Sequence, residues 1–177
     1  MRFSRLAFAF ALGVTPALGG EFQVGLGLFA LAPHGADVQI SYRAAGSPWS
    51  FGFRHVQWMD TFHDPFTGHA LSETTEARTG PLVTYRFHPQ APGSWYLGGA
   101  VYQWSKRERS LVFGDSNRDS TTAPLIGGGY TRSLGTWFYW NAGLFLGPGK
   151  TVRTKTSTGS EEDSGVFDIQ LQMGVRF

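Results

Sequence analysis

Residues 165–177 alternate strictly between apolar and polar side chains. Every odd position from 167 onward is apolar, and these residues are Phe167, Ile169, Leu171, Met173, Val175 and Phe177. The even positions between them are polar or glycine. Because successive side chains of a β-strand point to opposite faces, this period of two predicts a strand with one apolar and one polar face. The apolar face is long enough to cross a bilayer, which needs about 9–11 tilted residues.

Seven earlier segments show a similar pattern and complete a set of eight predicted strands. The strands are expected at 21–31, 37–45, 49–59, 77–87, 95–104, 122–132, 137–146 and 165–177. The alternation blurs between Val56 and Trp58, which predicts a bulge there. The segment 95–104 is aromatic at both ends and rich in glycine, so its phase is left open.

The connections between these strands alternate between short turns and long polar stretches. The long stretches are 60–76, 105–121 and 148–164, and they are predicted to be loops at one end of the molecule. Short turns at one end and long loops at the other are typical of transmembrane barrels. The predicted fold is therefore all-β: an eight-stranded, antiparallel, up-and-down transmembrane β-barrel. Aromatic residues at strand ends are expected to form interfacial girdles, with Trp58 and Trp104 at the outer rim.

Residues 1–19 read as a cleaved signal peptide, which leaves 20–177 as the barrel domain. Arg2 and Arg5 precede a short apolar core, and small residues stand at the expected cleavage site. The chain has 15 basic and 13 acidic residues, and two of the basic ones lie in this leader. The mature chain is then neutral, so its charge gives no indication of nucleic-acid binding.

An amphipathic last strand that ends in an aromatic residue resembles the closing strand of bacterial outer-membrane β-barrels. The whole pattern resembles the eight-stranded barrels of the OmpA and OmpX kind. This resemblance implies export to the bacterial outer membrane, contact with its lipid and lipopolysaccharide, and recognition of the last strand by the barrel assembly machinery. The structural alternative is a soluble, lipocalin-like secreted binding barrel, which would turn its apolar face inward.

Eight strands enclose an interior that side chains can fill, so a diffusion pore is not expected. The alternation directs several charged residues inward, and this predicted interior polar network comprises Arg43, Arg54, Arg86, Asp168 and Arg176. Few acids are assigned to the interior, mainly Asp168 and Asp37. Because buried charges need partners, two hypotheses remain: a plug of hydrogen-bonded side chains, or an anion or water near the periplasmic mouth.

Candidate chemistry is sparse. His63, Asp64 and His69 could bind a metal ion, but their spacing follows no metal-binding motif, and no cofactor is predicted. Deacylases among the barrels of this size carry a His-x-Ser motif, which none of the five histidines here begins. A structural or surface-binding role is therefore favoured over the alternative of a lipid A-modifying enzyme. The three long polar stretches are the candidate ligand surfaces, and Lys106, Arg107, Arg109 and Arg118 make the second one basic.

Overall fold

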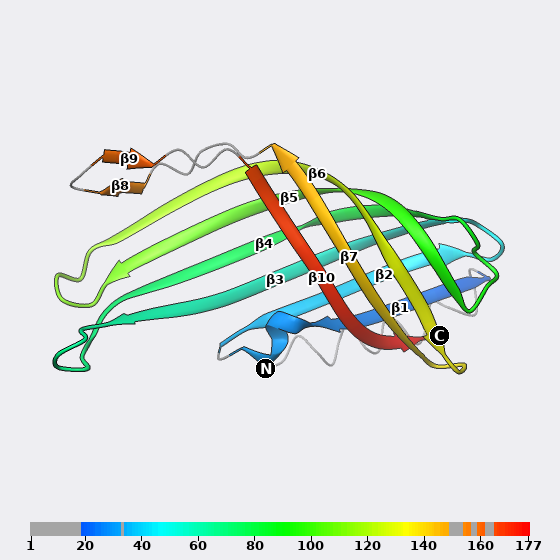
Figure 1. Cartoon of the computed structure of the whole chain (residues 1–177), viewed down its shortest axis with the longest axis horizontal. Coiled ribbons are helices and arrows are strands. Elements are labelled where there is room, and N and C mark those ends of the chain that lie inside the picture. The colour runs from blue at the N-terminus through cyan, green and yellow to red at the C-terminus, as the bar shows by residue number, and fades with distance from the viewer. Residues whose placement is uncertain (1–18, 33, 149–153, 157–158, 162–164) are drawn as a thin grey trace.

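The computed structural model describes residues 19–32, 34–148, 154–156, 159–161 and 165–177. Eight strands close into an antiparallel barrel in which each barrel strand pairs with the next and the first pairs with the last. They are β1 (Gly20–Gly27), β2 (Ala36–Ala44), β3 (Trp49–His63), β4 (Ala70–Arg86), β5 (Gly93–Ser110), β6 (Ser116–Leu134), β7 (Phe138–Pro148) and β10 (Gly165–Arg176) (Figure 1). The predicted up-and-down, eight-stranded barrel is confirmed.

Three short elements lie outside the barrel strands. A 3₁₀ helix, η1 (Leu28–Leu31), follows β1, and β8 (Thr154–Thr156) pairs with β9 (Gly159–Glu161) between β7 and β10. Within the described part of the chain, no helix has the length and apolar character needed to cross a membrane. The predicted signal peptide lies outside the described residues, apart from Gly19.

The outer face of the barrel wall is apolar, while the inner face combines polar side chains with a buried apolar cluster that includes Leu82 and Phe145. On β10, Asp168 and Gln170 are each 1% exposed and point into the barrel, whereas Leu171 is 46% exposed on the outside. Large apolar side chains on β3, β5, β6 and β7 are exposed on the outer face as well. A soluble, lipocalin-like barrel would not leave this much apolar surface on its outer wall, so the structure argues against that alternative.

The first strand is shorter than predicted. It ends at Gly27, and residues 28–31 form η1 instead of continuing the strand to residue 31. From Leu28 onward four apolar residues follow one another, so the period of two that specifies a strand face is lost. The turn of η1 leaves Leu28 and Leu31 exposed on the outside of the molecule.

The predicted bulge near Val56 is also wrong. Pairing between β3 and β4 is continuous from Trp49 to Phe62, and the register shifts only between Phe62 and His63. Val56 points inward and is 1% exposed. The alternation blurred because apolar residues occupy inward positions there, not because the backbone changes phase.

The phase of β5 is decided by packing inside the barrel. Tyr96 and Tyr102 are buried in the interior, while Trp95 and Leu97 are exposed on the outer face. The ring of Tyr96 fits because glycines stand opposite it. A Cβ atom at Gly143 would lie 2.2 Å from the Tyr96 hydroxyl oxygen, and one at Gly129 would lie 2.6 Å from it.

We expect Gly143→Ala to destabilise the barrel by about 1–3 kcal/mol, the range for overpacking a tight interior. The substitution should cost less in a Tyr96→Phe background, because the atom that the new methyl group meets has been removed. Urea titration of the protein folded in detergent micelles measures both values. Equal costs in the two backgrounds would show that the close approach to the hydroxyl is not what excludes a side chain.

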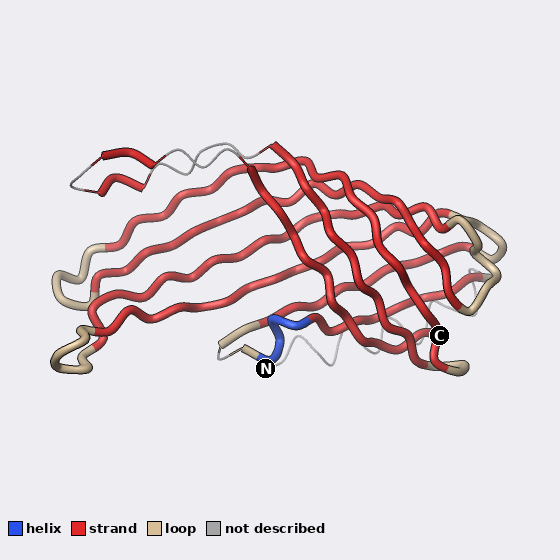
Figure 2. The backbone as a smooth tube through the Cα atoms, viewed as in Figure 1, coloured by secondary structure: helices blue, strands red, loops and turns tan. Residues whose placement is uncertain are grey.

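The polar stretches 60–76 and 105–121, predicted as loops, are mostly strand. Residues 64–69 connect β3 to β4, and residues 111–115 connect β5 to β6, so only these short turns lack strand structure (Figure 2). The third stretch, 148–164, lies largely outside the described residues, where β8 and β9 are the described elements. A loop was predicted because side chains on both faces are polar, and that composition hides the period of two.

Beyond the closed barrel, four strands continue as an open sheet. It begins where four residues pair across neighbouring strands, Trp58, Glu76, Lys106 and Asp119, and continues outward to the turns. We call this the projecting sheet; it comprises residues 58–63, 70–76, 106–110 and 116–119. Pairing of β3 with β2 stops at Gln57, and pairing of β6 with β7 stops at Ile126, so β3 and β6 are its edges. Figure 1 shows these strands extending past the rest of the barrel.

Candidate functional site

A buried ion cluster joins β2, β3 and β10 inside the barrel. The Arg54 guanidinium donates two hydrogen bonds to Asp37, each 2.9 Å long, and a third of 2.5 Å to Asp168. All three side chains are at most 1% exposed. A fork of two parallel bonds to one carboxylate is the strongest geometry for an arginine pair. The cluster therefore locks three strands together.

Arg78 lies above this cluster and fills the mouth of the barrel on the side of the projecting sheet. Its guanidinium stacks 4.0 Å from the ring centroid of Trp104 and 4.9 Å from that of Trp58. It also lies 3.7 Å from a carboxylate oxygen of Asp168. Trp58 stacks in turn on Phe29 of η1. The expectation that Trp58 and Trp104 form an outer girdle is therefore wrong, because both hold an inward arginine.

A second cluster lies at the other end of the barrel, around Glu21. Arg43 bonds this carboxylate at 2.8 Å, and Arg86 and Arg176 approach it to 3.8 and 3.7 Å. Arg43 and Arg176 also donate to carbonyl groups of the nearby turns. Glu21 was missing from the predicted interior, although its phase with Gln23 would have assigned it there. It supplies one carboxylate for three guanidinium groups, so the second cluster keeps a net charge of +2.

The centre of the barrel is closed to diffusion. Between the two clusters lies a cavity of about 20 Å³, lined mainly by polar side chains, including Gln39, Ser50 and Asn141. Such a volume holds about one water molecule. Gln172 bonds Gln39 across the interior at 3.0 Å, and Asn141 contacts Gln172 at 3.4 Å. Side chains therefore plug the lumen.

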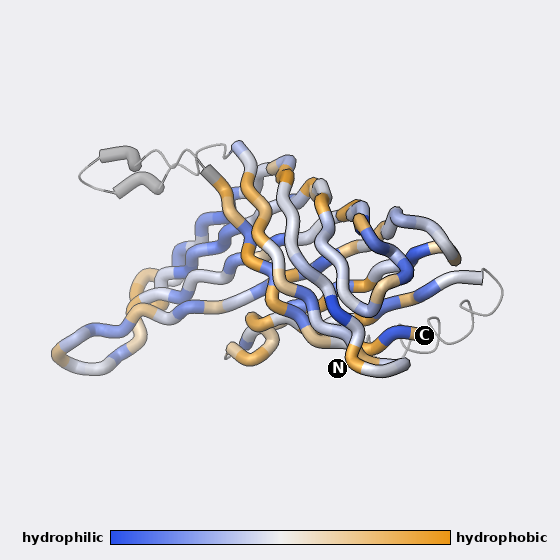
Figure 3. Tube along the Cα trace, turned by 45° about the vertical axis from the view of Figure 1, so that its right-hand side comes forward, coloured by the Kyte–Doolittle hydropathy of each residue, from blue (hydrophilic) through white to orange (hydrophobic). Residues whose placement is uncertain are grey.

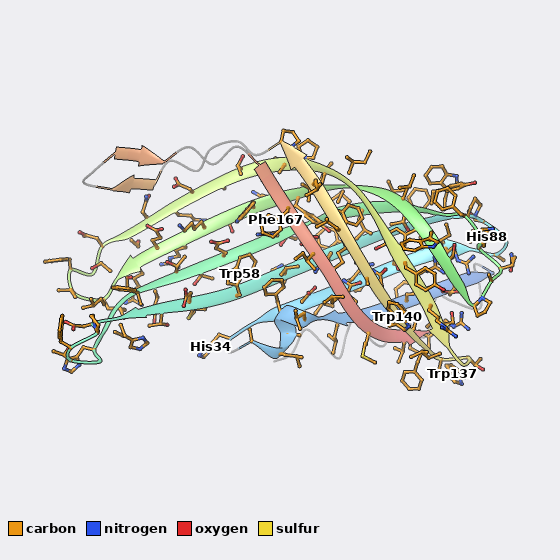
Figure 4. The ribbon with its side chains drawn as sticks, viewed as in Figure 1. His34, Trp58, His88, Trp137, Trp140 and Phe167 are labelled. Carbon is orange, nitrogen blue, oxygen red and sulfur yellow. The ribbon has the colours of Figure 1, made fainter. Side chains whose placement is uncertain are left out.

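Aromatic side chains gather at the end of the barrel that carries the short turns. Trp49 packs edge-on against Tyr85, and Tyr85 against Phe87. Further along the same rim, Trp95 packs against Tyr130, and Trp137 against Phe177. Figure 4 labels Trp137 near the end of the strands. A belt of this kind is typical of a membrane interface.

The candidate metal ligands lie at the tip of the β3–β4 hairpin. The Asp64 carboxylate accepts backbone hydrogen bonds from Phe66 and Thr67, which close the turn and hold the pKa of that carboxyl below its ordinary value. His63 contacts the carbonyl oxygen of Thr61. Within the described ranges, no group of three or more His, Asp or Glu side chains is arranged to hold a metal ion.

The projecting sheet separates its charges by face. Alternation along each strand places four carboxylates and one lysine on the face continuous with the barrel interior, a net charge of −3: Asp60, Glu76, Lys106, Glu108 and Asp119. The opposite face carries three arginines and one glutamate, a net charge of +2: Glu73, Arg107, Arg109 and Arg118. We call the second set the basic face. Figure 3 shows hydrophilic residues along this part of the strands.

The basic face contains an unfavourable pair. Arg107 and Arg118 stand directly opposite each other in the β5–β6 ladder. Like charges in this position destabilise a sheet. Both side chains are exposed, and neither forms an ion pair with another described residue. Their repulsion costs folding stability, and the pair leaves positive charge uncompensated on the basic face.

The tips of the projecting sheet are unusually apolar for a surface. The turns carry Phe66, 96% exposed, and Phe113, 81% exposed. A backbone hydrogen bond of 2.9 Å from Leu111 to Leu71 ties the two hairpins together near their tips. Apolar side chains beside exposed arginines are a composition typical of binding interfaces. The tips therefore extend the candidate binding surface.

Comparison with solved structures finds similar folds among outer-membrane barrels, three of which are described below. The crystal structure of Ail, the attachment invasion locus protein of Yersinia pestis, in complex with the heparin analogue sucrose octasulfate, is 17% identical, with a TM-score of 0.59, over 90% of this chain and 100% of Ail. Neisserial surface protein A is 15% identical (TM-score 0.52, 89% and 92% covered). The N-terminal β-barrel domain of Pseudomonas aeruginosa OprF is 14% identical (TM-score 0.54, 89% and 96% covered).

These likenesses concern the fold. No protein-family model matches the chain, and no curated protein sequence matches it. The residues of the basic face and of the interior clusters are therefore interpreted from their own geometry.

Proposed function

We propose that this chain, which has the fold of the small eight-stranded outer-membrane barrels, is itself an outer-membrane protein that binds an anionic ligand at the cell surface. The exposed apolar outer wall supports a lipid environment, because so large an apolar surface is costly in water. The short turns and the aromatic rim would then lie at the periplasmic side, and the projecting sheet outside. Residues 1–19 would serve as the cleaved signal peptide.

We also propose that the closing strand, β10, takes part in assembly of the barrel. The apolar row from Phe167 to Phe177 on β10 would be the signal that the barrel assembly machinery recognises. Phe22 and Phe177 exchange backbone hydrogen bonds of 3.1 and 2.9 Å, so the last residue also closes the barrel. Recognition of this strand in cells and closure of the barrel would therefore use the same residues.

The observation that carries the binding role is the unpaired Arg107–Arg118 juxtaposition. Arg107 lies six residues beyond Val101, which is apolar and exposed on the outer face of the same strand. At about 3.3 Å per residue this distance is about 20 Å along the tilted strand. The basic face would then lie in the layer of phosphate-bearing sugars of lipopolysaccharide. We therefore propose these phosphates as the ligand, and the sulfated sugar bound to Ail is a comparable polyanion.

The lumen and the histidines support a binding protein over a channel or an enzyme. The interior cavity of about 20 Å³ is too small for a solute pathway. His55, the histidine on the outer wall, contacts the Thr79 hydroxyl at 2.7 Å. No described acid orients its ring, so the arrangement differs from a catalytic triad. Among the described residues, no arrangement of side chains of this kind supports a role in lipid A modification.

Removing the arginine pair should weaken ligand binding. We expect Arg107→Ala/Arg118→Ala to reduce affinity for the phosphorylated oligosaccharide of lipopolysaccharide about 100-fold or more, since each of the two charged contacts contributes about 1.4 kcal/mol or more. Isothermal titration of the folded protein in detergent measures this change, and binding should weaken further as salt is added. Arg132→Ala, which removes an exposed arginine from the opposite end of β6, is the matched control.

Two outcomes would contradict the proposal. The first is equal affinity of the double variant and the Arg132→Ala control. The second is binding of a dephosphorylated oligosaccharide as tightly as the phosphorylated one. If a heparin-type sulfated oligosaccharide binds in place of the lipopolysaccharide sugar, the basic face is a polyanion site but its ligand is a sulfated glycan.

A further inference from the structure

The barrel wall is incomplete at the seam between β1 and β10. Their pairing begins at Gln23 with Arg176 and stops at Gly27 with Gln172. β10 continues for seven more residues to Gly165, still paired with β7 on its other edge. Over that length the strand has no β-ladder partner on the β1 side among the described residues. The wall is therefore open toward the outside above Gly27.

Two carbonyl groups of β10 point into this opening. Phe22 and Phe177 exchange both of their backbone hydrogen bonds, so the odd residues of β10 direct their backbone groups toward β1. The carbonyl groups of Ile169 and Phe167 lie on that edge beyond the end of the ladder. An unpaired carbonyl in hydrocarbon costs several kcal/mol.

Arginines from the barrel interior take the place of the missing strand. Arg78 donates to the carbonyl oxygen of Phe167 at 2.9 Å, and Arg54 donates to that of Ile169 at 3.4 Å. Both guanidinium groups also form ion pairs with Asp168. These two carbonyl groups of β10 are thus satisfied from inside the barrel.

An apolar groove of about 600 Å³ lies on the outer surface beside the end of the β1–β10 ladder. One wall is η1, which contributes Leu28, Ala30 and Leu31. The other wall consists of Leu171 and Met173 of β10, with Trp140 of β7 beyond them. Figure 4 labels Trp140 on β7, and it labels Phe167 on β10. The volume lies within the range of about 300–1,000 Å³ usual for ligand sites.

We propose that this seam groove binds the acyl chain of a membrane lipid. The inference rests on the proposed membrane location. The groove is continuous with the outward apolar row of β10, so a chain could enter it directly from the bilayer. Its lining is almost wholly apolar, which suits hydrocarbon. Because η1 forms one wall of the groove, an acyl chain there would be held more firmly than the acyl chains that contact the rest of the outer wall.

A polypeptide strand is a poorer occupant of the same groove. An added β-strand would need the edge carbonyl groups of β10 as acceptors. Those of Phe167 and Ile169 are already occupied by Arg78 and Arg54. A strand would have to displace two guanidinium groups that the buried Asp168 holds in place. An acyl chain requires no hydrogen bond and leaves the arginines where they are.

Photolabelling tests the proposal. The full-length mature protein is folded into phosphatidylethanolamine–phosphatidylglycerol vesicles that contain a phospholipid with a diazirine on one acyl chain. After illumination, labelled positions are mapped by peptide mass spectrometry. We expect several-fold more label on residues 28–31 and 171–173 than on Phe51 and Phe53, which are exposed on the outer wall away from the groove.

Filling the groove should remove the excess label. Ala30→Trp should reduce labelling of residues 171–173 to the level of Phe51 and Phe53, whereas Val101→Trp, on the outer wall of β5, should leave it unchanged. Slower gel migration after heating confirms that each variant has folded. If Ala30→Trp does not fold, Met173→Trp fills the groove from its opposite wall, and labelling of residues 28–31 is then read.

The possible failures are distinct. Equal labelling of the groove and of Phe51 and Phe53, or excess label that persists in the filled variant, would overturn the acyl-chain site while leaving the barrel in the membrane. Absence of label from every outward position would instead contradict the membrane location itself.

Discussion

Arg54→Met should lower the free energy of unfolding by about 3–5 kcal/mol, the usual cost of breaking a buried ion pair by removing one partner. Arg54 is fully buried, and its guanidinium bonds both Asp37 and Asp168. Without it, two carboxylates face each other in the interior with no cation between them. The carbonyl group of Ile169 also loses a donor. Denaturant titration of the barrel folded in lipid vesicles measures the loss.

A double variant is the control for charge. In Arg54→Met/Asp37→Asn one charge of each sign is removed together, and Arg78 keeps Asp168 as its partner. Because replacing a buried ion pair by neutral groups of similar volume is often nearly neutral for stability, the double variant should recover much of the lost stability. Arg176→Met, at the mouth of the barrel where the side chain is 25% exposed, should cost far less. If Arg54→Met and Arg176→Met cost the same, the buried cluster is not what holds β2, β3 and β10 together.

Leu171→Arg should destabilise the folded barrel by about 2–4 kcal/mol, the cost of an arginine on the lipid face near the bilayer midplane. Leu171 lies midway along β10 with its side chain on the outer face. Val112→Arg is the matched control, because Val112 is similarly exposed but belongs to the tip of the β5–β6 hairpin. The control should change stability little, since its side chain already contacts water.

Folding both variants in phospholipid vesicles and in short-chain detergent separates the possible causes. The difference between Leu171→Arg and Val112→Arg should be largest in vesicles, where the hydrocarbon region has a defined thickness. Equal effects of the two substitutions in vesicles would contradict the placement of β10 across the membrane. An interior control such as Gln172→Arg is less informative, because Gln172 is buried among Gln39 and Asn141 and an arginine there would overpack the lumen.

Strand extent was the least predictable part of the fold. A strand that is half in hydrocarbon and half in water shows the period of two only along the part whose outer face is apolar. β10 has that period throughout and was predicted from end to end. β5 and β6 lose it beyond residues 104 and 122, although their ladder continues to Arg109 and Ser116. The projecting sheet is held together by backbone hydrogen bonds, which require no alternation of apolar and polar residues.

The partners of the charged residues were only partly predictable. Alternation directed Arg54 and Asp168 inward, since each belongs to the polar phase of its own strand. That Arg54 would lie between Asp37 and Asp168 depends on β2, β3 and β10 meeting around the barrel. Glu21 was missed because, as the first residue of the predicted strand, it was not assigned to either face. Arg78 was missed because its neighbours on β4 are polar on both faces.

The sequence by itself determined the fold class, the number of barrel strands and the apolar outer face, because these depend on neighbours two residues apart. Tertiary structure alone decided where β1 ends, how far β3 to β6 project, and which charges meet. These features depend on register between strands distant in sequence. The seam groove and the Arg107–Arg118 pair exist only once that register is set, because each is formed by residues from different strands.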